Sequence, residues 1–234
     1  MPVLPGFPPV EIMLRRSGRT RRFSLRVSRL DGRVTLSMPL RARESEALRF
    51  AAEQEDWIRR TLADLPTHRL VAMGDAIPVE GRFLTLTPGV GRSLRAEGDS
   101  LWVPGDSAQA AARVSAYLKV LARDRLARAC DRYSAALGLP YTRLTLRDTR
   151  SRWGSCAQDG ALMFSWRLIM APPSVLEYVA AHEVAHLAEM NHAPAFWAVV
   201  ERLYPGWKTQ RTWLHAEGQA LHGYCFAARP VGAA

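Results

Sequence analysis

The stretch that decides the fold of the C-terminal part of the chain is residues 174–192, SVLEYVAAHEVAHLAEMNH. It follows two prolines and is apolar at most positions in its first half, so it predicts a largely buried helix from about Ser174 to near Met190. Two histidines, His182 and His186, lie four residues apart on this helix. That spacing sets them about 40° apart around the axis and about 6 Å apart along it, so both imidazoles can bind one metal ion.

Glu183 follows the first histidine and projects one position around the helix from it. There its carboxylate can reach a water activated by the metal, which is the arrangement of a general base in a metal-dependent hydrolase. Ionisable groups on a buried helix need partners, and a zinc ion would provide one. We therefore predict one zinc ion per chain.

Catalytic zinc takes three protein ligands, so a third is needed. We favour His192, because imidazole suits zinc and Asn191 before it tolerates the backbone conformation in which helices often end. Three carboxylates remain as alternatives: Glu189, Glu201 and Glu217.

Short apolar segments and turn residues predict the elements around this helix. Alternating residues over 142–148 and residues 152–156 and 162–166, with a turn at Asp159-Gly160, predict strands that include a hairpin. Residues 194–203 and 207–221 predict two further helices. Upstream, residues 107–138 predict a long helix with Ser107 as its N-cap and Gly138 as its stop. We place a domain boundary before that helix and expect domains over residues 1–105 and 106–234.

The N-terminal part predicts a β-rich module with a helix, so the fold class is α+β. Residues 23–27 and 34–38 predict a hairpin around Asp31-Gly32, residues 44–65 an amphipathic helix, and residues 70–103 further strands. Eight arginines lie between residues 10 and 38, against only Glu11 and Asp31. They form either a solvated face or a surface for a polyanion or nucleic acid.

Composition fits a globular protein of ordinary make-up, with 48% hydrophobic and 23% charged residues and a formal net charge of +10. Three widely spaced cysteines form no paired motif, so we expect reduced thiols and a cytoplasmic location. Prolines interrupt the first nine residues before a signal peptide could form. We expect no membrane association, and the sequence leaves the oligomeric state open.

The run from His182 to Leu187, followed by Asn191-His192 and Phe196-Trp197, resembles the YgjP-like metallopeptidase family, which is related to the WLM and SprT-type zinc proteases. Residues 152–156 and 166–168 resemble the same family. The resemblance implies a minimal zincin-like domain, with a small antiparallel sheet over an active-site helix. It also implies that His182, His186 and His192 bind zinc and that Glu183 is the catalytic acid and base.

We therefore expect a zinc-dependent peptidase. Trp153, Gly154 and Ser155 are candidates for an edge strand that binds peptide, and Tyr204 and His215 are candidates to stabilise an oxyanion. One alternative is a metal-dependent hydrolase of nucleotide phosphoanhydrides, a pyrophosphatase, although no glycine-rich phosphate loop supports it. Another is a nucleic-acid-docked protease or binding module that uses the arginine-rich hairpins.

Overall fold

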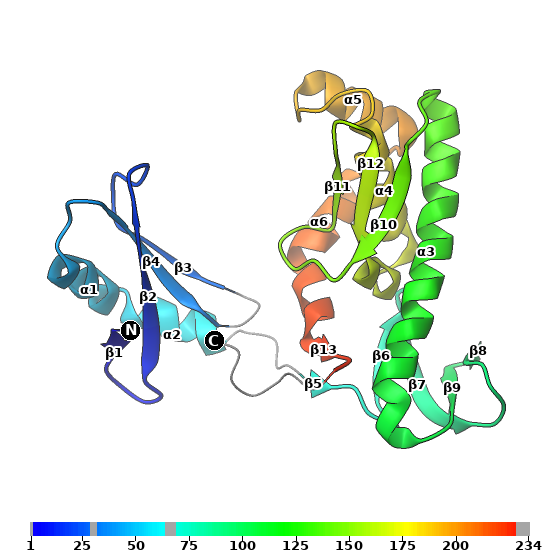
Figure 1. Cartoon of the computed structure of the whole chain (residues 1–234), viewed down its shortest axis with the longest axis horizontal. Helices are drawn as coiled ribbons and strands as arrows, with labels where there is room; N and C mark the ends of the chain where they lie inside the picture. Colours follow the sequence, from blue (N-terminus) through cyan, green and yellow to red (C-terminus); the bar gives the residue numbers. More distant parts are fainter. Residues whose placement is uncertain (1, 29–31, 64–68, 228–234) are drawn as a thin grey trace. The chain divides into compact units, whose positions relative to one another are not determined.

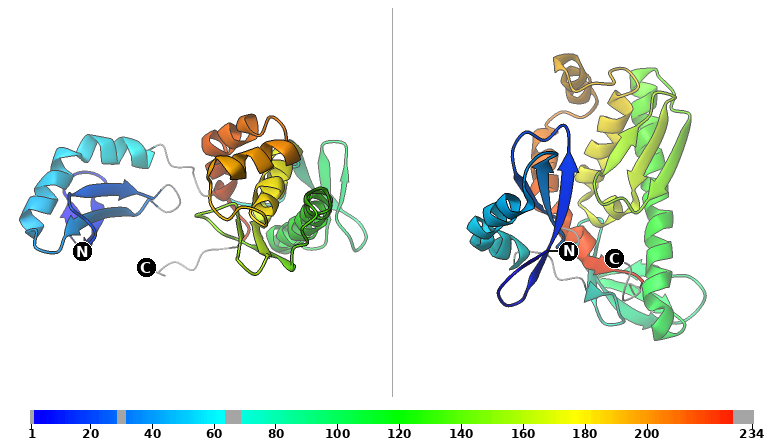
Figure 2. Two further views of the ribbon diagram at one scale, coloured as in Figure 1. Left: turned by 90° about the horizontal axis from the view of Figure 1, so that it is seen from above. Right: turned by 60° about the vertical axis from the view of Figure 1, so that its left-hand side comes forward.

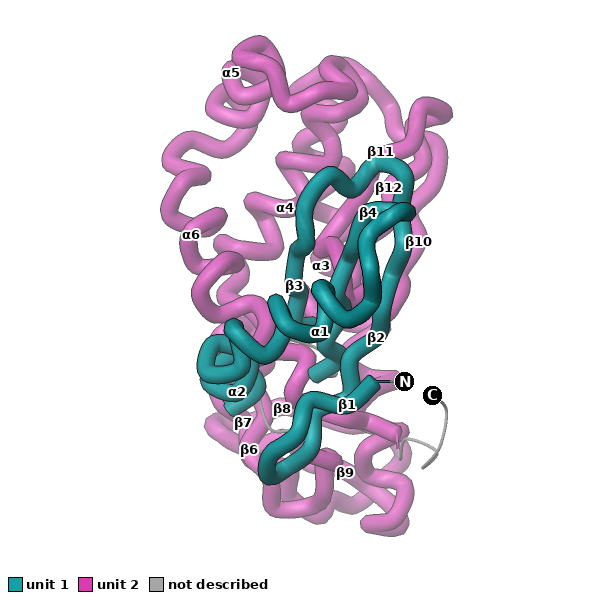
Figure 3. The backbone as a smooth tube through the Cα atoms, turned by 90° about the vertical axis from the view of Figure 1, so that its left-hand side faces the viewer, with its two compact units in different colours: residues 1–67 teal, residues 68–234 magenta. Residues whose placement is uncertain are grey.

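A computed structural model describes residues 2–28, 32–63 and 69–227 of the chain. Backbone contacts divide it into two compact units, residues 1–67 and residues 68–234, which Figure 3 draws in different colours. The boundary predicted from the sequence, after residue 105, lies within the second unit. The difference arises because the strands before that residue share one hydrophobic core with the long helix that follows it.

The first unit is a four-stranded sheet covered on one face by two helices (Figure 1). Its strands are β1 (Val3–Leu4), β2 (Val10–Ser17), β3 (Ser24–Val27) and β4 (Val34–Pro39), in the order β1-β2-β4-β3. The predicted pairing of β3 with β4 is confirmed, since these strands are antiparallel and Val27 faces Val34. The expected turn lies partly outside the described residues, because Asp31 is not among them.

Two helices replace the single one predicted over residues 44–65. They are α1 (Glu44–Glu53) and α2 (Glu55–Ala63), and residues 64 and 65 lie outside the described part. The chain leaves helical geometry at Gln54. The break lets fully buried side chains of both helices, Ala51 and Ile58, pack in the core that covers one face of the sheet.

The second unit begins with a small sheet and the long helix. The sheet holds β6 (Ala76–Val79), β7 (Arg82–Gly89), β8 (Arg95–Glu97) and β9 (Ser100–Pro104), in the order β6-β7-β9-β8. A 3-10 turn, η1 (Ser107–Gln109), leads into α3 (Ala110–Leu137). The cap is Asp106 and not Ser107, because the Asp106 carboxylate accepts a hydrogen bond from the Ala108 amide at 3.0 Å. Gly138 ends α3 with a left-handed φ of 76°, as predicted.

The rest of the second unit surrounds the helix that carries the two histidines, α4 (Pro173–Ala185) (Figures 1 and 2). A three-stranded sheet contains β10 (Arg143–Arg147), β11 (Gly154–Cys156) and β12 (Ala161–Ser165). After it come the 3-10 helix η2 (Trp166–Met170), α5 (Pro194–Leu203), α6 (Lys208–Ala216) and the 3-10 helix η3 (Gly218–Gly223). A short ladder pairs β13 (Tyr224–Cys225) with β5 (Arg69–Leu70).

The β10–β12 sheet is mixed, whereas a purely antiparallel sheet was expected. The predicted hairpin joins β11 to β12, but β10 lies parallel to β12. In the strand order β10-β12-β11, the last strand, β12, lies between the other two. Since β10 and β11 run in opposite directions, β12 is parallel to one and antiparallel to the other.

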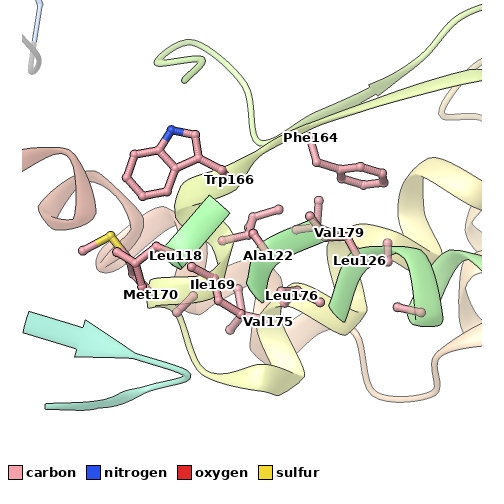
Figure 4. Packing of buried hydrophobic residues seen from close by; sticks show 14 of the residues in the cluster. Leu118, Ala122, Leu126, Phe164, Trp166, Ile169, Met170, Val175, Leu176 and Val179 are labelled. Atoms are coloured by element: carbon pink, nitrogen blue, oxygen red, sulfur yellow. The ribbon is translucent and has the colours of Figure 1, made fainter. Parts of the chain in front are cut away.

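The core of the second unit forms where α3 packs against α4. Leu118, Ala122 and Leu126 of α3 meet Val175 and Val179 of α4 (Figure 4), and all are buried. Buried positions run around the whole of α4, so this helix is covered on every side and is not amphipathic. Among the described residues, no helix is both long enough and apolar enough to cross a bilayer.

A buried guanidinium connects distant parts of the second unit. Arg167 of η2 donates two hydrogen bonds to the carboxylate of Asp148, with Nε to Oδ1 at 2.6 Å and Nη2 to Oδ2 at 3.1 Å. Its Nη1 donates to the backbone oxygens of Leu221 and Tyr224 at 2.8 and 2.9 Å. A charge this deeply buried needs such partners, so Arg167 ties η3 and β13 to the chain after β10.

A tight turn fixes the β6–β7 hairpin against the start of α4. Glu80 and Gly81 form the turn with φ values of 49° and 79°. The Glu80 amide donates to the Ile169 oxygen at 2.7 Å, and its carboxylate binds Arg125 at 2.6 Å. A Cβ atom on Gly81 would lie 2.8 Å from the Cα atom of Pro172. Only glycine fits here without displacing backbone.

We predict that Gly81→Ala lowers the free energy of unfolding by about 1–3 kcal/mol more than Gly98→Ala does, because overpacking adds to backbone strain only at position 81. Gly98 also has a positive φ, 56°, but a Cβ there meets nothing within 4 Å, which makes it the matched control. Urea unfolding of both variants measures the difference. Equal losses would show that the Pro172 contact is unimportant.

Candidate metal centre

The end of α4 brings three imidazoles together. His182 lies on the last turn of the helix, and His186 is its C-cap. The helix ends at Ala185, earlier than the predicted end near Met190, because the Leu187 amide bonds back to Val184 and tightens the turn. The chain then reverses before α5, and His192 returns to the other two histidines.

The spacing of the three rings fits a tetrahedral metal ion. One nitrogen from each of the three histidines lies within 4.8 Å of the others. The Nε2 atoms of His182 and His192 are 3.1 Å apart. Two nitrogens bound to one zinc at 2.0–2.1 Å would lie about 3.3 Å apart, so a small adjustment accommodates the ion.

The protonation of the rings also fits a cation. Burial, followed by the charges of His186 and His192, lowers the pKa of His182 to about 3, and burial lowers the pKa of His186. Burial therefore favours the neutral form of His182 and of His186. The Nε2 atoms of His182 and His192, 3.1 Å apart, must share either a proton or a cation. His186 Nδ1 lies 2.9 Å from the Glu189 oxygen, which favours a proton there and leaves Nε2 as the ligand atom. The buried Nδ1 of His182 has no hydrogen-bond partner among the described residues.

Two aromatic side chains of α5 hold the imidazoles in place. The fully buried ring of Phe196 lies 4.4–4.9 Å from the three imidazole centroids. Trp197 contacts His182 and His192 at 5.8 and 5.7 Å. Packing of this kind limits ring rotation and so keeps the ligand atoms oriented.

Glu183 lies beside the histidines with its carboxylate packed against the β11 backbone. A Cβ atom on Gly154 would lie 2.5 Å from Glu183 Oε1 and 2.6 Å from its Cγ, so glycine leaves the room that this side chain occupies. Glu183 is 6% exposed. This burial raises its pKa to about 8, although the charge of Arg152 acts in the opposite direction.

A cavity of about 360 Å³ opens beside these residues. Gly154, His182 and Glu183 line one part of it, and Arg211 and His215 of α6 line another. A second hollow of about 470 Å³ is lined by His186 and by residues 157–160. Hollows therefore flank the histidines towards both ends of β11.

The edge of the sheet next to this cavity is open. Strand β11 pairs only with β12 among the described strands. The Trp153 oxygen accepts a hydrogen bond from a backbone amide of β12, and the Ala157 amide donates one to a backbone oxygen of β12. Because such bonds alternate along an antiparallel pair, the backbone groups of Gly154 and Cys156 point to the open edge.

Some of the other candidate residues line the cavity and some do not. Trp153 and Gly154 line the cavity, and Ser155 lies between Gly154 and Cys156 on β11. The Trp153 ring also stacks on His222 at 5.2 Å, so it serves the core as well. His215 lines the cavity, whereas Tyr204, at the end of α5, is not among its lining residues.

The alternative ligands lie outside the histidine cluster. Glu189 contributes its backbone oxygen to His186. Glu201 accepts a hydrogen bond from the Gly206 amide at 3.5 Å, and Glu217 is the C-cap of α6. Among the described residues, the group able to hold a metal therefore contains the three histidines without these carboxylates.

Several residues that line the cavity were not predicted from the sequence, among them Tyr178, Arg211 and Gln219. The guanidinium of Arg211 lies over Trp197 at 5.1 Å and over Trp207 at 5.8 Å, and no ion pair joins it to a carboxylate of the described chain. A signal was present, because Arg211 and His215 lie four residues apart and therefore share one face of α6.

Comparisons with known proteins assign the chain to a family. A family model described as "YgjP-like, metallopeptidase domain" matches residues 21–217. A solved structure described as the metallopeptidase zymogen of Pyrococcus abyssi abylysin is similar at 19% identity and a TM-score of 0.38, over 40% of this chain and 95% of that chain. No curated protein sequence matches. Because the family model spans most of the chain, the protein belongs to the YgjP-like family of metallopeptidase domains and is a metal-dependent peptidase.

Proposed function

We propose that this protein hydrolyses peptide bonds with one zinc ion held by His182, His186 and His192 and with Glu183 as general base. The observation that carries the proposal is the convergence of three imidazoles beside a buried carboxylate, in a cavity open to substrate. All-imidazole ligation suits zinc better than it suits magnesium or calcium, which prefer oxygen ligands.

The chain's own residues would handle the proton. When bound, zinc would polarise the scissile carbonyl and bring the pKa of a bound water near neutrality. Glu183 would accept the proton lost during attack and return it to the leaving amine. Its buried position supports this role, because the burial that raises its pKa also makes the carboxylate a stronger proton acceptor.

We place the peptide substrate along the open edge of β11. The backbone groups of Gly154 and Cys156 are free to bond to an extended peptide, as in other cases of strand addition. The hollows towards both ends of β11 leave room for side chains on both sides of the scissile bond. Trp153, Gly154 and Ser155 are thus substrate-binding residues in this proposal.

Two residues of α6 would stabilise negative charge. Arg211 and His215 line the same cavity as Glu183, so they are placed to donate hydrogen bonds to an oxyanion. We rank His215 above Tyr204 for this role, because Tyr204 does not line the cavity. Arg211 would serve equally in the phosphoanhydride alternative, and assays for pyrophosphate release from nucleotides distinguish the two.

We keep the cytoplasm as the proposed location. Cys130 and Cys156 are free thiols, and Cys130 is buried. Thiols in this state fit a reducing compartment.

We predict that Glu183→Gln lowers kcat for peptide hydrolysis by about 10²–10⁴-fold, because glutamine cannot accept the proton. Zinc content, measured by elemental analysis, should match that of the unmodified protein, since Glu183 is not a ligand in this proposal. Unchanged turnover would refute the assignment of the base.

We predict that His192→Ala lowers zinc content and peptidase activity together, because two imidazoles hold the ion much less tightly than three. Glu189→Gln is the matched control, since it alters the alternative ligand nearest in sequence and should keep the metal. Equilibrium dialysis against zinc measures both variants. The opposite result, with zinc lost only from Glu189→Gln, would make the carboxylate the third ligand.

We predict that Gly154→Ala lowers kcat about 100-fold, because its Cβ would push the Glu183 carboxylate about 1 Å from its position. Zinc content should not change, since no ligand is touched. Thermal unfolding of the zinc-loaded protein serves as the control for folding. A variant with wild-type kcat would show that the close approach of Gly154 to Glu183 does not position the base.

A further inference from the structure

The solvent-facing side of the sheet in the first unit is strongly basic. Along each strand the residues alternate, so Ile12, Leu36 and Val27 face the helices while Arg15 and Arg26 face away from them. The register places Arg15 beside Ser37 and Arg26 beside Thr35. Arginine and hydroxyl side chains therefore share one face of three neighbouring strands.

This face is hollowed. The hollow has a volume of about 330 Å³ and is lined by three arginines, Arg15, Arg26 and Arg33, and by four hydroxyl side chains that include Thr35 and Ser37. The described residues that line it include no carboxylate. The described chain offers no ion pair or hydrogen bond to the guanidinium of Arg15 or Arg26, so these two are available to an anion.

The basic surface continues beyond the hollow. Strand β2 ends at Ser17 and β3 begins at Ser24 at the same end of the sheet, since both face the end of β4. The connection between them carries Arg19, Arg21 and Arg22, all exposed. From the level of Arg33 to that of Ser37 the sheet alone extends for about 13 Å, so the array is longer than one phosphate group.

Charge is segregated between the two layers of this unit. Residues 1–43 contain ten arginines and two carboxylates, Glu11 and Asp31, whereas residues 44–63 contain three arginines and five carboxylates. The second segment forms α1 and α2, which cover the opposite face of the sheet. Glu11 also faces away from the helices, but it is acidic and lies beside β1.

We propose that this basic sheet face, made by Arg15, Arg26, Arg33 and the loop arginines 19, 21 and 22, binds the phosphate backbone of nucleic acid. A row of guanidiniums with hydroxyl groups between them matches consecutive phosphates, because each guanidinium binds phosphate through two N–H groups. Among its described residues this face carries no aromatic ring on which bases could stack, since Phe23 packs against Phe50 at 5.8 Å beside the core. Binding is therefore independent of sequence.

The test uses the full chain and fluorescein-labelled oligonucleotides of about 20 nucleotides, with fluorescence anisotropy between about 50 and 200 mM salt. We expect binding that weakens steeply with salt. Arg15→Gln combined with Arg26→Gln should weaken it about tenfold and reduce the slope of log K against log salt by about 1.4 for a single strand, or about 0.7 for each lost phosphate contact.

The matched control is Arg49→Gln combined with Arg60→Gln, which makes the same change in net charge on the helical layer. It should leave affinity within about twofold. Equal loss in both double variants would mean that only net charge matters, and salt-independent or absent binding would also overturn the proposal. So would equally tight binding of a nucleoside triphosphate, or binding to vesicles of anionic lipid in place of oligonucleotides. The proposal does not depend on peptidase activity, because Glu183→Gln should bind the oligonucleotides as the unmodified protein does.

Discussion

The burial of α4 is the constraint on which the rest of the site depends. A helix covered on every side cannot keep ionisable side chains near its end unless neighbouring elements supply their partners. Three neighbouring segments accommodate these side chains. His192 returns after the helix, Phe196 packs on the imidazoles, and Gly154 leaves space for Glu183. The metal centre is therefore a consequence of how this helix is enclosed as much as of its own sequence.

Features encoded by local spacing were predicted from the sequence. The helix that bears His182 and Glu183, the following helix over residues 194–203, the stop at Gly138 and the hairpin before Ser165 all follow from neighbouring residues. Features that depend on distant partners were not. The parallel pairing of β10 with β12 and the place of Arg211 in the cavity are set by tertiary contacts, which no local pattern contains.

Arg167 illustrates the same limit. An arginine in a run such as Trp166-Arg167-Leu168 gives no sign that its side chain will be buried or that its partners lie at Asp148 and Leu221. Once placed, it closes the second unit, because it fixes the segment that carries Gln219 and His222. That segment contributes Gln219 to the lining of the cavity, and its His222 stacks on Trp153, so a structural ion pair helps to shape the site.

The open edge of β11 has a consequence for the behaviour of the protein in solution. Unpaired backbone groups on a sheet edge attract strands from any chain, including other copies of the same protein. Here the edge is only three residues long and begins with glycine, and both features weaken strand pairing. The protein can therefore keep an edge accessible without offering a template on which its own molecules would aggregate.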